Sequence, residues 1–150
     1  MEQNPQKVQE ILEKIRNATE NNNWVEINTQ LEQKRLQWFE ISKSNLQSQE
    51  TDVRRAYTLF LIQYLKIDPN EVPIIYENDK KIVWRSFNWC PVLEACKKGE
   101  FDTREVCKRG WEQSVQKFIA KVNPKLIFSR NYDKIRPHTP YCEETIELME

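Results

Sequence analysis

The spacing of apolar residues changes once along this chain of 150 residues, and that change limits the fold class it can adopt. Up to residue 67 the apolar positions recur three or four residues apart, as they do from Val8 to Ile15, which indicates amphipathic helices. After residue 72, short apolar runs alternate with polar positions, as half-buried strands do. The sequence therefore predicts one domain over residues 1–150, with a helical part over 1–67 and an α+β part over 72–150.

Three helices are predicted in the helical part. Asn4 and Pro5 form a cap and first-turn pair for a helix that extends to about residue 19, and a second helix is expected over residues 24–47. Thr51 is the expected cap of a third helix, which is apolar on nearly every side. The first two helices form a hairpin, which either packs on the rest of the chain or serves as a dimerisation arm.

The α+β part is predicted to contain about four strands and two further helices in a small antiparallel sheet structure. The expected strands lie at 74–76, 82–84, 126–132 and 141–148, and the expected helices at 91–98 and 103–122. Gly99 is expected to close the first of these helices, and Asp102 to cap the second. In the last strand Cys142 and Ile146 share one face, and Glu144 is the exception to the polar and apolar alternation.

The 23 basic and 23 acidic side chains balance in number but not in position. Residues 80–137 hold 14 basic and 6 acidic groups, so a basic segment lies between two acidic ends. Two interpretations stay open: folding brings the acidic ends against this segment, or the segment receives a small anionic molecule or an acidic partner protein. No nucleic-acid partner is expected, because long Lys/Arg tracts and zinc-finger spacings are missing from the sequence.

The sequence also bears on the compartment and on the state of the four cysteines. Because no apolar run approaches the roughly 18 residues of a membrane span and no signal-peptide pattern is found, we expect a soluble, cytoplasmic protein with no membrane partner. Thiols stay reduced there, so disulfides are not expected. The spacing Cys90-x5-Cys96-x10-Cys107-x34-Cys142 contains no C-x2-C pair and matches no common zinc or ferredoxin motif. The oligomeric state is not determined by any of these features.

Cys90 is the leading candidate for chemistry because it lies where a helix is predicted to begin. Free N–H groups and the helix dipole favour a thiolate there. Glu94 follows four residues later on the same face, as a candidate acid/base or as a second group facing a bound ion. Cys96 is expected to pack in the core. Cys107 and Cys142 lie on apolar faces, where inert burial and convergence on one site both remain open.

One set of residues resembles a known family. The set comprises Cys90-Pro91-Val92-Leu93-Glu94, a lone Cys107 in the next helix, Asn123-Pro124-Lys125-Leu126-Ile127-Phe128-Ser129-Arg130, Ile135 and Cys142. Over roughly residues 82–148 this pattern is similar to the L-2-amino-thiazoline-4-carboxylic acid hydrolase-like family, whose members named for chemistry open a thiazoline ring by hydrolysis. The resemblance implies that Cys90, Cys107 and Cys142 form a thiol site, with Glu94 beside it and Arg130 on the adjoining strand.

The first function hypothesis is a hydrolase that acts on carbon–nitrogen bonds of a small carboxylated metabolite. In it Cys90 is the nucleophile, Glu94 the acid/base, and Arg130 or Arg85 clamps the carboxylate through a bidentate pair. His138 is an alternative base, although its Pro-flanked loop favours a simple surface role.

The second hypothesis is a non-catalytic protein in which thiolates hold a metal or the basic segment senses an anionic ligand. The sequence does not identify a cofactor, and under this hypothesis the metal is zinc or an iron–sulfur cluster, because both favour soft thiolate ligands. The candidate ligands are Cys90, Cys107, Cys142 and Cys96. The remaining alternative is a domain whose buried cysteines are inert.

Overall fold

The computed structural model describes residues 4–42 and 50–149. Its helices are α1 (Pro5–Asn21), α2 (Val25–Ser42), α3 (Asp52–Tyr57), η2 (Thr58–Tyr64), η3 (Pro69–Glu71), α4 (Pro91–Gly99), α5 (Thr103–Gly110) and α6 (Glu112–Ala120). Its strands are β1 (Ile74–Glu77), β2 (Lys81–Ser86), β3 (Leu126–Arg130) and β4 (Cys142–Leu148). The predicted α+β class is confirmed. Over these residues, no helix combines the length and the apolar character needed to cross a membrane.

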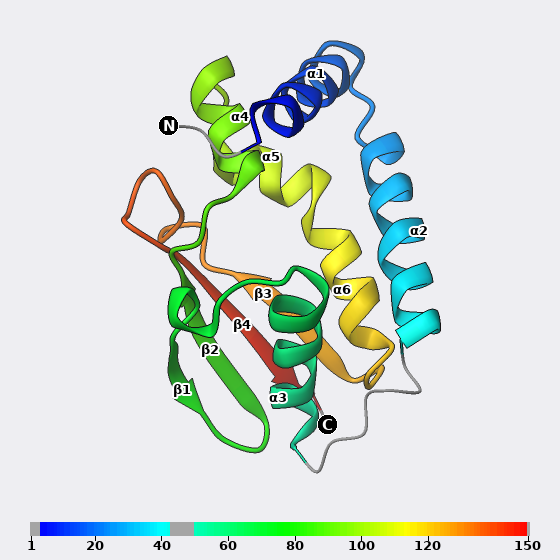
Figure 1. Ribbon diagram of the computed structural model, residues 1–150, viewed down its shortest axis with the longest axis vertical. Coiled ribbons are helices and arrows are strands. Elements are labelled where there is room, and N and C mark those ends of the chain that lie inside the picture. The colour runs from blue at the N-terminus through cyan, green and yellow to red at the C-terminus, as the bar shows by residue number, and fades with distance from the viewer. Residues whose placement is uncertain (1–3, 43–49, 150) are drawn as a thin grey trace.

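The first two helices begin where the sequence indicates. The Asn4 side-chain oxygen accepts a hydrogen bond from the Lys7 backbone N–H at 3.2 Å, and Pro5 occupies the first turn of α1. α2 is described as far as Ser42, and residues 43–47 of its expected extent lie outside the described residues. α1 packs against α4 and α2 packs against α6, so the helical hairpin covers its own chain (Figure 1).

The third predicted helix is present, but its hydrogen-bonding pattern changes halfway. Thr51 Oγ1 caps α3 by accepting a hydrogen bond from the Arg54 backbone N–H at 3.2 Å. The chain then continues as the π-helix η2, in which the Leu65 N–H donates to the Phe60 carbonyl at 3.0 Å, five residues back. Residues 59–61 of η2 are all buried, so this segment lies inside the core as its apolar sequence indicates.

The four strands lie in the order β1-β2-β4-β3, and every neighbouring pair is antiparallel. The hairpin of β1 and β2 turns at Asn78, whose side-chain oxygen accepts hydrogen bonds from the backbone N–H groups of Lys80 and Lys81, each at 2.9 Å. β4 lies between β2 and β3, with Ile146 opposite both Ile82 and Phe128. The C-terminal strand therefore joins the two halves of the sheet (Figure 1).

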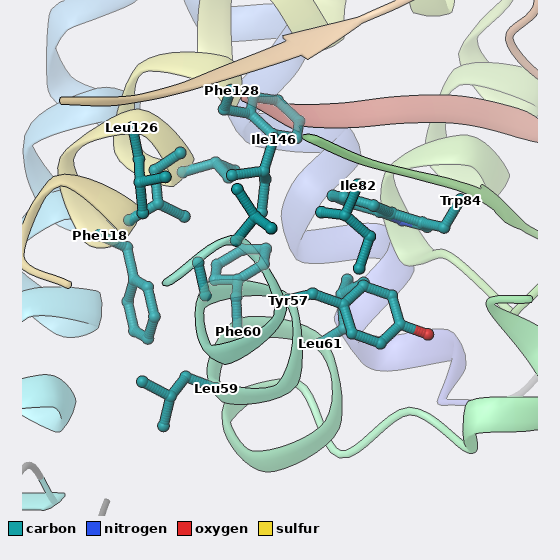
Figure 2. Packing of buried hydrophobic residues seen from close by; sticks show 14 of the residues in the cluster. Tyr57, Leu59, Phe60, Leu61, Ile82, Trp84, Phe118, Leu126, Phe128 and Ile146 are labelled. Atoms are coloured by element: carbon teal, nitrogen blue, oxygen red, sulfur yellow. The ribbon is translucent and has the colours of Figure 1, made fainter. Parts of the chain in front are cut away.

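The main hydrophobic core lies between one face of the sheet and the segments α3, η2, α6 and α2 (Figure 2). Phe118 of α6 is fully buried, and its ring centre lies 5.1 Å from that of Phe60 and 5.5 Å from that of Phe39. On the sheet side, the rings of Trp84 and Tyr57 are 5.3 Å apart. These aromatic contacts join the helices to the sheet.

A second hydrophobic cluster lies between α1, α4 and α5. It contains Val8, Ile11, Leu12, Ile15, Val92, Ala95, Cys96 and Val106. Gly99 is the last residue of α4 rather than the residue beyond it, and Glu100 takes the left-handed conformation with φ 58°. A Cβ at Gly99 would lie 2.5 Å from Leu12 Cδ1, so this glycine permits the close approach of α1 to α4.

The single helix expected over residues 103–122 is in fact two helices. Asp102 caps α5 as predicted, with its Oδ1 accepting a hydrogen bond from the Arg104 backbone N–H at 2.9 Å. α5 ends at Gly110, and Trp111 leaves the helical region with φ −125°. A Cβ at Gly110 would lie 3.2 Å from the Trp24 ring. The break lets α5 join the second cluster while α6 packs in the main core.

Candidate thiol and arginine site

The inner face of the sheet changes from apolar to polar along its strands. In β2 the inward positions run from Ile82 through Trp84 to Ser86, and in β4 they run from Ile146 through Glu144 to Cys142. Arg130 ends the same series on β3. The polar ends of the three strands lie side by side, next to the segment that leads into α4. Two of the predicted site residues, Arg130 and Cys142, lie at this edge of the inner face.

Glu144 is the centre of this polar edge. Its Oε1 accepts a hydrogen bond from Ser86 Oγ at 2.9 Å, and its Oε2 lies 3.1 Å from Arg130 Nη2. The Glu144 charge raises the pKa of Arg130 even though burial of the guanidinium acts in the opposite direction. Glu144 therefore breaks the alternation of β4 because it neutralises a buried arginine.

Arg136 connects the loop at residues 131–141 with three other segments. Its Nε and its backbone N–H both lie 3.4 Å from Cys142 Sγ. Its Nη1 donates to the Asn88 carbonyl at 2.6 Å, two residues before Cys90. Its own carbonyl accepts a hydrogen bond from Thr103 Oγ1 at 2.7 Å, at the start of α5. The side chain and the backbone of this one residue thus tie β4 to the segment before α4 and to the start of α5.

The four cysteines are all free thiols that share this region. Cys90 caps the N-terminus of α4 and packs, together with Cys107 of α5, against the second cluster that contains Cys96. A charge on Cys142 raises the pKa of both Cys90 and Cys107, so these three thiols lie within electrostatic range of one another. The charge of Arg136 lowers the pKa of Cys90, and the charge of Arg130 lowers the pKa of Cys107.

Burial decides the protonation of these thiols. The backbone N–H groups of Val92 and Leu93 and the charge of Arg136 favour the Cys90 thiolate, but desolvation outweighs them and raises its pKa. Desolvation likewise raises the pKa of Cys107 to about 12 and that of Cys96 to about 12. The N–H groups at the helix start therefore act on Cys90 in the expected direction, and burial in the folded chain opposes them.

Two other predicted site residues are engaged elsewhere. Glu94 Oε1 lies 3.5 Å from Lys97 Nζ, and Glu94 is not among the groups that shift the Cys90 pKa. Arg85 alternates with Ser86 along β2 and therefore lies on the outer face of the sheet. There its Nε lies 3.2 Å from Glu143 Oε1, and its guanidinium lies 4.4 Å from the centre of the Tyr141 ring. Arg85 and Arg130 thus lie on opposite faces, and only Arg130 faces the thiols.

The geometry does not fit the predicted metal centre. Across the part of the chain that the structure describes, no group of three or more His, Cys, Asp or Glu side chains is arranged to hold a metal ion. The thiols of Cys90, Cys96, Cys107 and Cys142 are therefore not placed as ligands of zinc or of an iron–sulfur cluster. Cys96, only 1% exposed, instead packs with the apolar residues of the second cluster.

Arg136 was not predicted as a site residue, because it lies in a turn-rich loop without helical or strand periodicity. The one sequence signal for the polar edge was Glu144, a charged residue at an inward position of an alternating strand. His138, the alternative base, has its Nε2 3.6 Å from Asp102 Oδ1, and 42% of its side chain is exposed.

Two shallow depressions lie elsewhere on the surface, and neither is lined by cysteine. One of about 100 Å³ lies between the end of α1 and the start of α5, lined in part by Thr19, Phe101 and Asp102. The other, of about 300 Å³, is an open depression along α1 beside Glu10 and Glu13. In the thiol region Cys90, Cys142 and Arg136 are half-buried, so part of each residue is open to solvent.

Comparisons with known proteins were made at the level of families, curated proteins and solved structures. No family model, no curated protein and no solved structure matches this chain. The similarity to thiazoline-carboxylate hydrolase-like proteins therefore stays a prediction that rests on the residues alone.

Proposed function

We propose that this protein binds a small carboxylated, thiol-related metabolite at the region formed by Cys90, Cys107, Cys142, Arg130 and Arg136. The observation that carries the proposal is the pairing of two guanidinium groups with three thiols at one polar edge of an otherwise apolar sheet face. A guanidinium recognises a carboxylate through a planar pair of hydrogen bonds, and a cysteine-derived ligand presents a carboxylate close to sulfur.

The protonation of the thiols supports recognition more strongly than nucleophilic catalysis. A cysteine attacks as its thiolate, whereas burial raises the pKa of both Cys90 and Cys107. Glu94, the expected acid/base, is paired with Lys97. Hydrolysis of a carbon–nitrogen bond is accordingly the activity to test second, and binding is the one to test first.

Charge supports an anionic ligand. The segment over residues 80–137 has a net charge of plus eight from its 14 basic and 6 acidic groups, and it supplies both arginines. Of these two arginines, Arg130 is paired internally with Glu144, and no carboxylate of the described residues lies within ion-pair distance of Arg136. A positive potential on this side would favour encounter with small anions.

The test is a titration of isotope-labelled protein, followed by nuclear magnetic resonance of its backbone amides. The probes are L-cysteine and 2-amino-2-thiazoline-4-carboxylate, each added up to about 10 mM, which detects dissociation constants in the millimolar range. We expect the amide signals of Cys90, Cys107 and Cys142 to shift, and Cys142→Ala to weaken binding. A matched outer-face variant, Thr145→Val, should bind as the unmodified protein does.

Two results would count against the proposal. Unchanged amide signals at all three cysteines with both probes would show that this edge is not a metabolite site. Equal weakening by Cys142→Ala and by Thr145→Val would show that the thiol contributes nothing specific. Incubation with the thiazoline, followed by mass spectrometry of the products, then separates a binding protein from a hydrolase. Hydrolytic ring opening adds one molecule of water to the thiazoline, whereas binding alone leaves its mass unchanged.

A further inference from the structure

We propose that Arg136, rather than Arg130 or Arg85, is the residue that recognises the carboxylate of the ligand at the thiol site. This inference rests on the proposed function and names the group within the site that sets ligand specificity. It is carried by the different partners of the three arginines and by the position of Arg136 between two thiols.

Arg85 and Arg130 already have carboxylate partners of their own. Arg85 pairs with Glu143 on the outer face of the sheet, away from the thiols. Arg130 pairs with Glu144, and both of these side chains are largely removed from water. An incoming carboxylate would have to displace an internal one in either place, and at Arg130 it would leave Glu144 buried without its counter-charge.

Arg136 differs because its partners are neutral. Its Nε donates to a thiol and its Nη1 to a backbone carbonyl, and within residues 4–42 and 50–149 no carboxylate lies within ion-pair distance of it. Its Nη2 donates to no described atom and is not among the buried atoms that lack a partner. The guanidinium therefore offers an uncompensated charge and the free N–H donors of Nη2, which retains contact with solvent.

The surroundings hold Arg136 in a fixed orientation. The backbone N–H and Nε both bond Cys142, the carbonyl accepts from the buried Thr103, and Nη1 reaches the Asn88 carbonyl. Such anchoring lowers the entropy lost when a ligand binds. A carboxylate on the free edge of this guanidinium would lie beside Cys142 and near Cys90, whose pKa the Arg136 charge already influences.

Arg130 contributes in a different way. Its Nη1 is buried and has no hydrogen-bond partner among the described residues. A buried donor of this kind is stabilised when a water or a ligand oxygen accepts from it. Arg130 can therefore receive a neutral polar atom of the ligand, while Arg136 receives the charge.

The experiment compares a matched pair of probes that differ only in the carboxylate, namely 2-amino-2-thiazoline-4-carboxylate and 2-amino-2-thiazoline. Dissociation constants are measured by nuclear magnetic resonance for the unmodified protein, Arg136→Gln, Arg136→Lys and the outer-face control Arg85→Gln. For Arg136→Gln we expect binding of the carboxylate to weaken about tenfold or more, with binding of the carboxylate-free probe unchanged within about twofold. Arg136→Lys keeps the charge but loses the planar fork, so it should weaken carboxylate binding about threefold.

The outcomes separate this inference from the proposed function. If the unmodified protein binds neither probe, both fall together. If it binds the carboxylate and Arg136→Gln binds it equally well, or loses both probes to the same extent, the role of Arg136 is overturned while the proposed function stands. A comparable loss in Arg85→Gln would also overturn it. Should Arg136→Gln not fold, the same comparison is decided by Arg136→Lys.

Discussion

Arg130 and Glu144 form a buried ion pair across neighbouring strands, with Nη2 of the arginine 3.1 Å from Oε2 of the glutamate. Their side chains are only 12% and 10% exposed, and the register of β3 and β4 places the two residues directly opposite each other. Ser86 holds the second carboxylate oxygen. Because both charges are withdrawn from water, each depends on the other.

Replacement of Glu144 should therefore be strongly destabilising. We expect Glu144→Gln to lower the free energy of unfolding by about 3 kcal/mol or more, because it leaves the Arg130 charge buried and uncompensated. The matched control is Glu77→Gln, whose partner Arg54 lies 2.6 Å away in a pair that is 33% and 38% exposed. This control should lose less than about 1 kcal/mol in urea denaturation. Equal losses in the two variants would contradict the prediction that loss of the partner charge costs more in the buried pair than in the exposed pair.

The raised thiol pKa values predict loss of stability at alkaline pH. For Cys96 the pKa rises from the ordinary 9.0 to about 12 in the folded protein, because the thiolate cannot be hydrated there. Between these values the folded state binds more protons than the unfolded state, so the contribution of this thiol is complete below pH 9.0 and is lost as pH rises toward about 12.

Cys96→Val tests this dependence by removing the titrating group and keeping an apolar side chain. Urea midpoints at pH of about 8 and about 10.5 should fall further in the unmodified protein than in the variant. The quantity compared is the fall in the urea midpoint between the two pH values. The lysines and tyrosines are the same in both proteins and contribute equally to that fall. Parallel declines would indicate that Cys96 reaches solvent in the folded state.

Gly99→Ala should destabilise the protein, although alanine normally favours a helix. The added Cβ would lie 2.5 Å from Leu12 Cδ1 and 2.6 Å from Phe101 Cε2, so both side chains must move. We expect a loss of about 1–3 kcal/mol, measured by thermal or urea unfolding. The double variant with Leu12→Ala and Gly99→Ala should lose less stability than the sum of the losses in the two single variants. Additive losses would mean that Leu12 does not restrict this position.

Arg35 lies in the core with neutral partners, and its removal should be tolerated. The residue is 7% exposed, its Nη1 donates to Ser114 Oγ at 2.7 Å, and burial lowers its pKa to about 10. Arg35→Met fills a similar volume without a charge, so we expect the free energy of unfolding to stay the same or to rise by up to about 2 kcal/mol. The exposed Arg109→Met should change stability by no more than about 0.5 kcal/mol. A loss above about 2 kcal/mol in Arg35→Met would show that its hydrogen bonds outweigh the cost of burying the charge.

The candidate site was only partly predictable. The sequence indicated the region of Cys90 and Cys107, and the Glu144 exception pointed to a buried polar group in β4. Arg136 could not be found this way, because its role depends on Asn88 and Thr103, which lie 48 and 33 residues away in the chain. Similarly, Arg85 and Arg130 are both arginines of strands, and only the assembled sheet shows that they face opposite sides.

The sequence alone determined the helix starts at Asn4, Thr51 and Asp102, the hairpin turn at Asn78 and the inward face of β4. Each depends on neighbours within a few residues, through side-chain caps and through the spacing of apolar residues. The tertiary structure alone decided the break at Trp111 and the direction in which the Cys90 pKa moves. A helix start favours a thiolate locally, but the segments that fold over Cys90 remove its water, and desolvation then outweighs the local N–H groups.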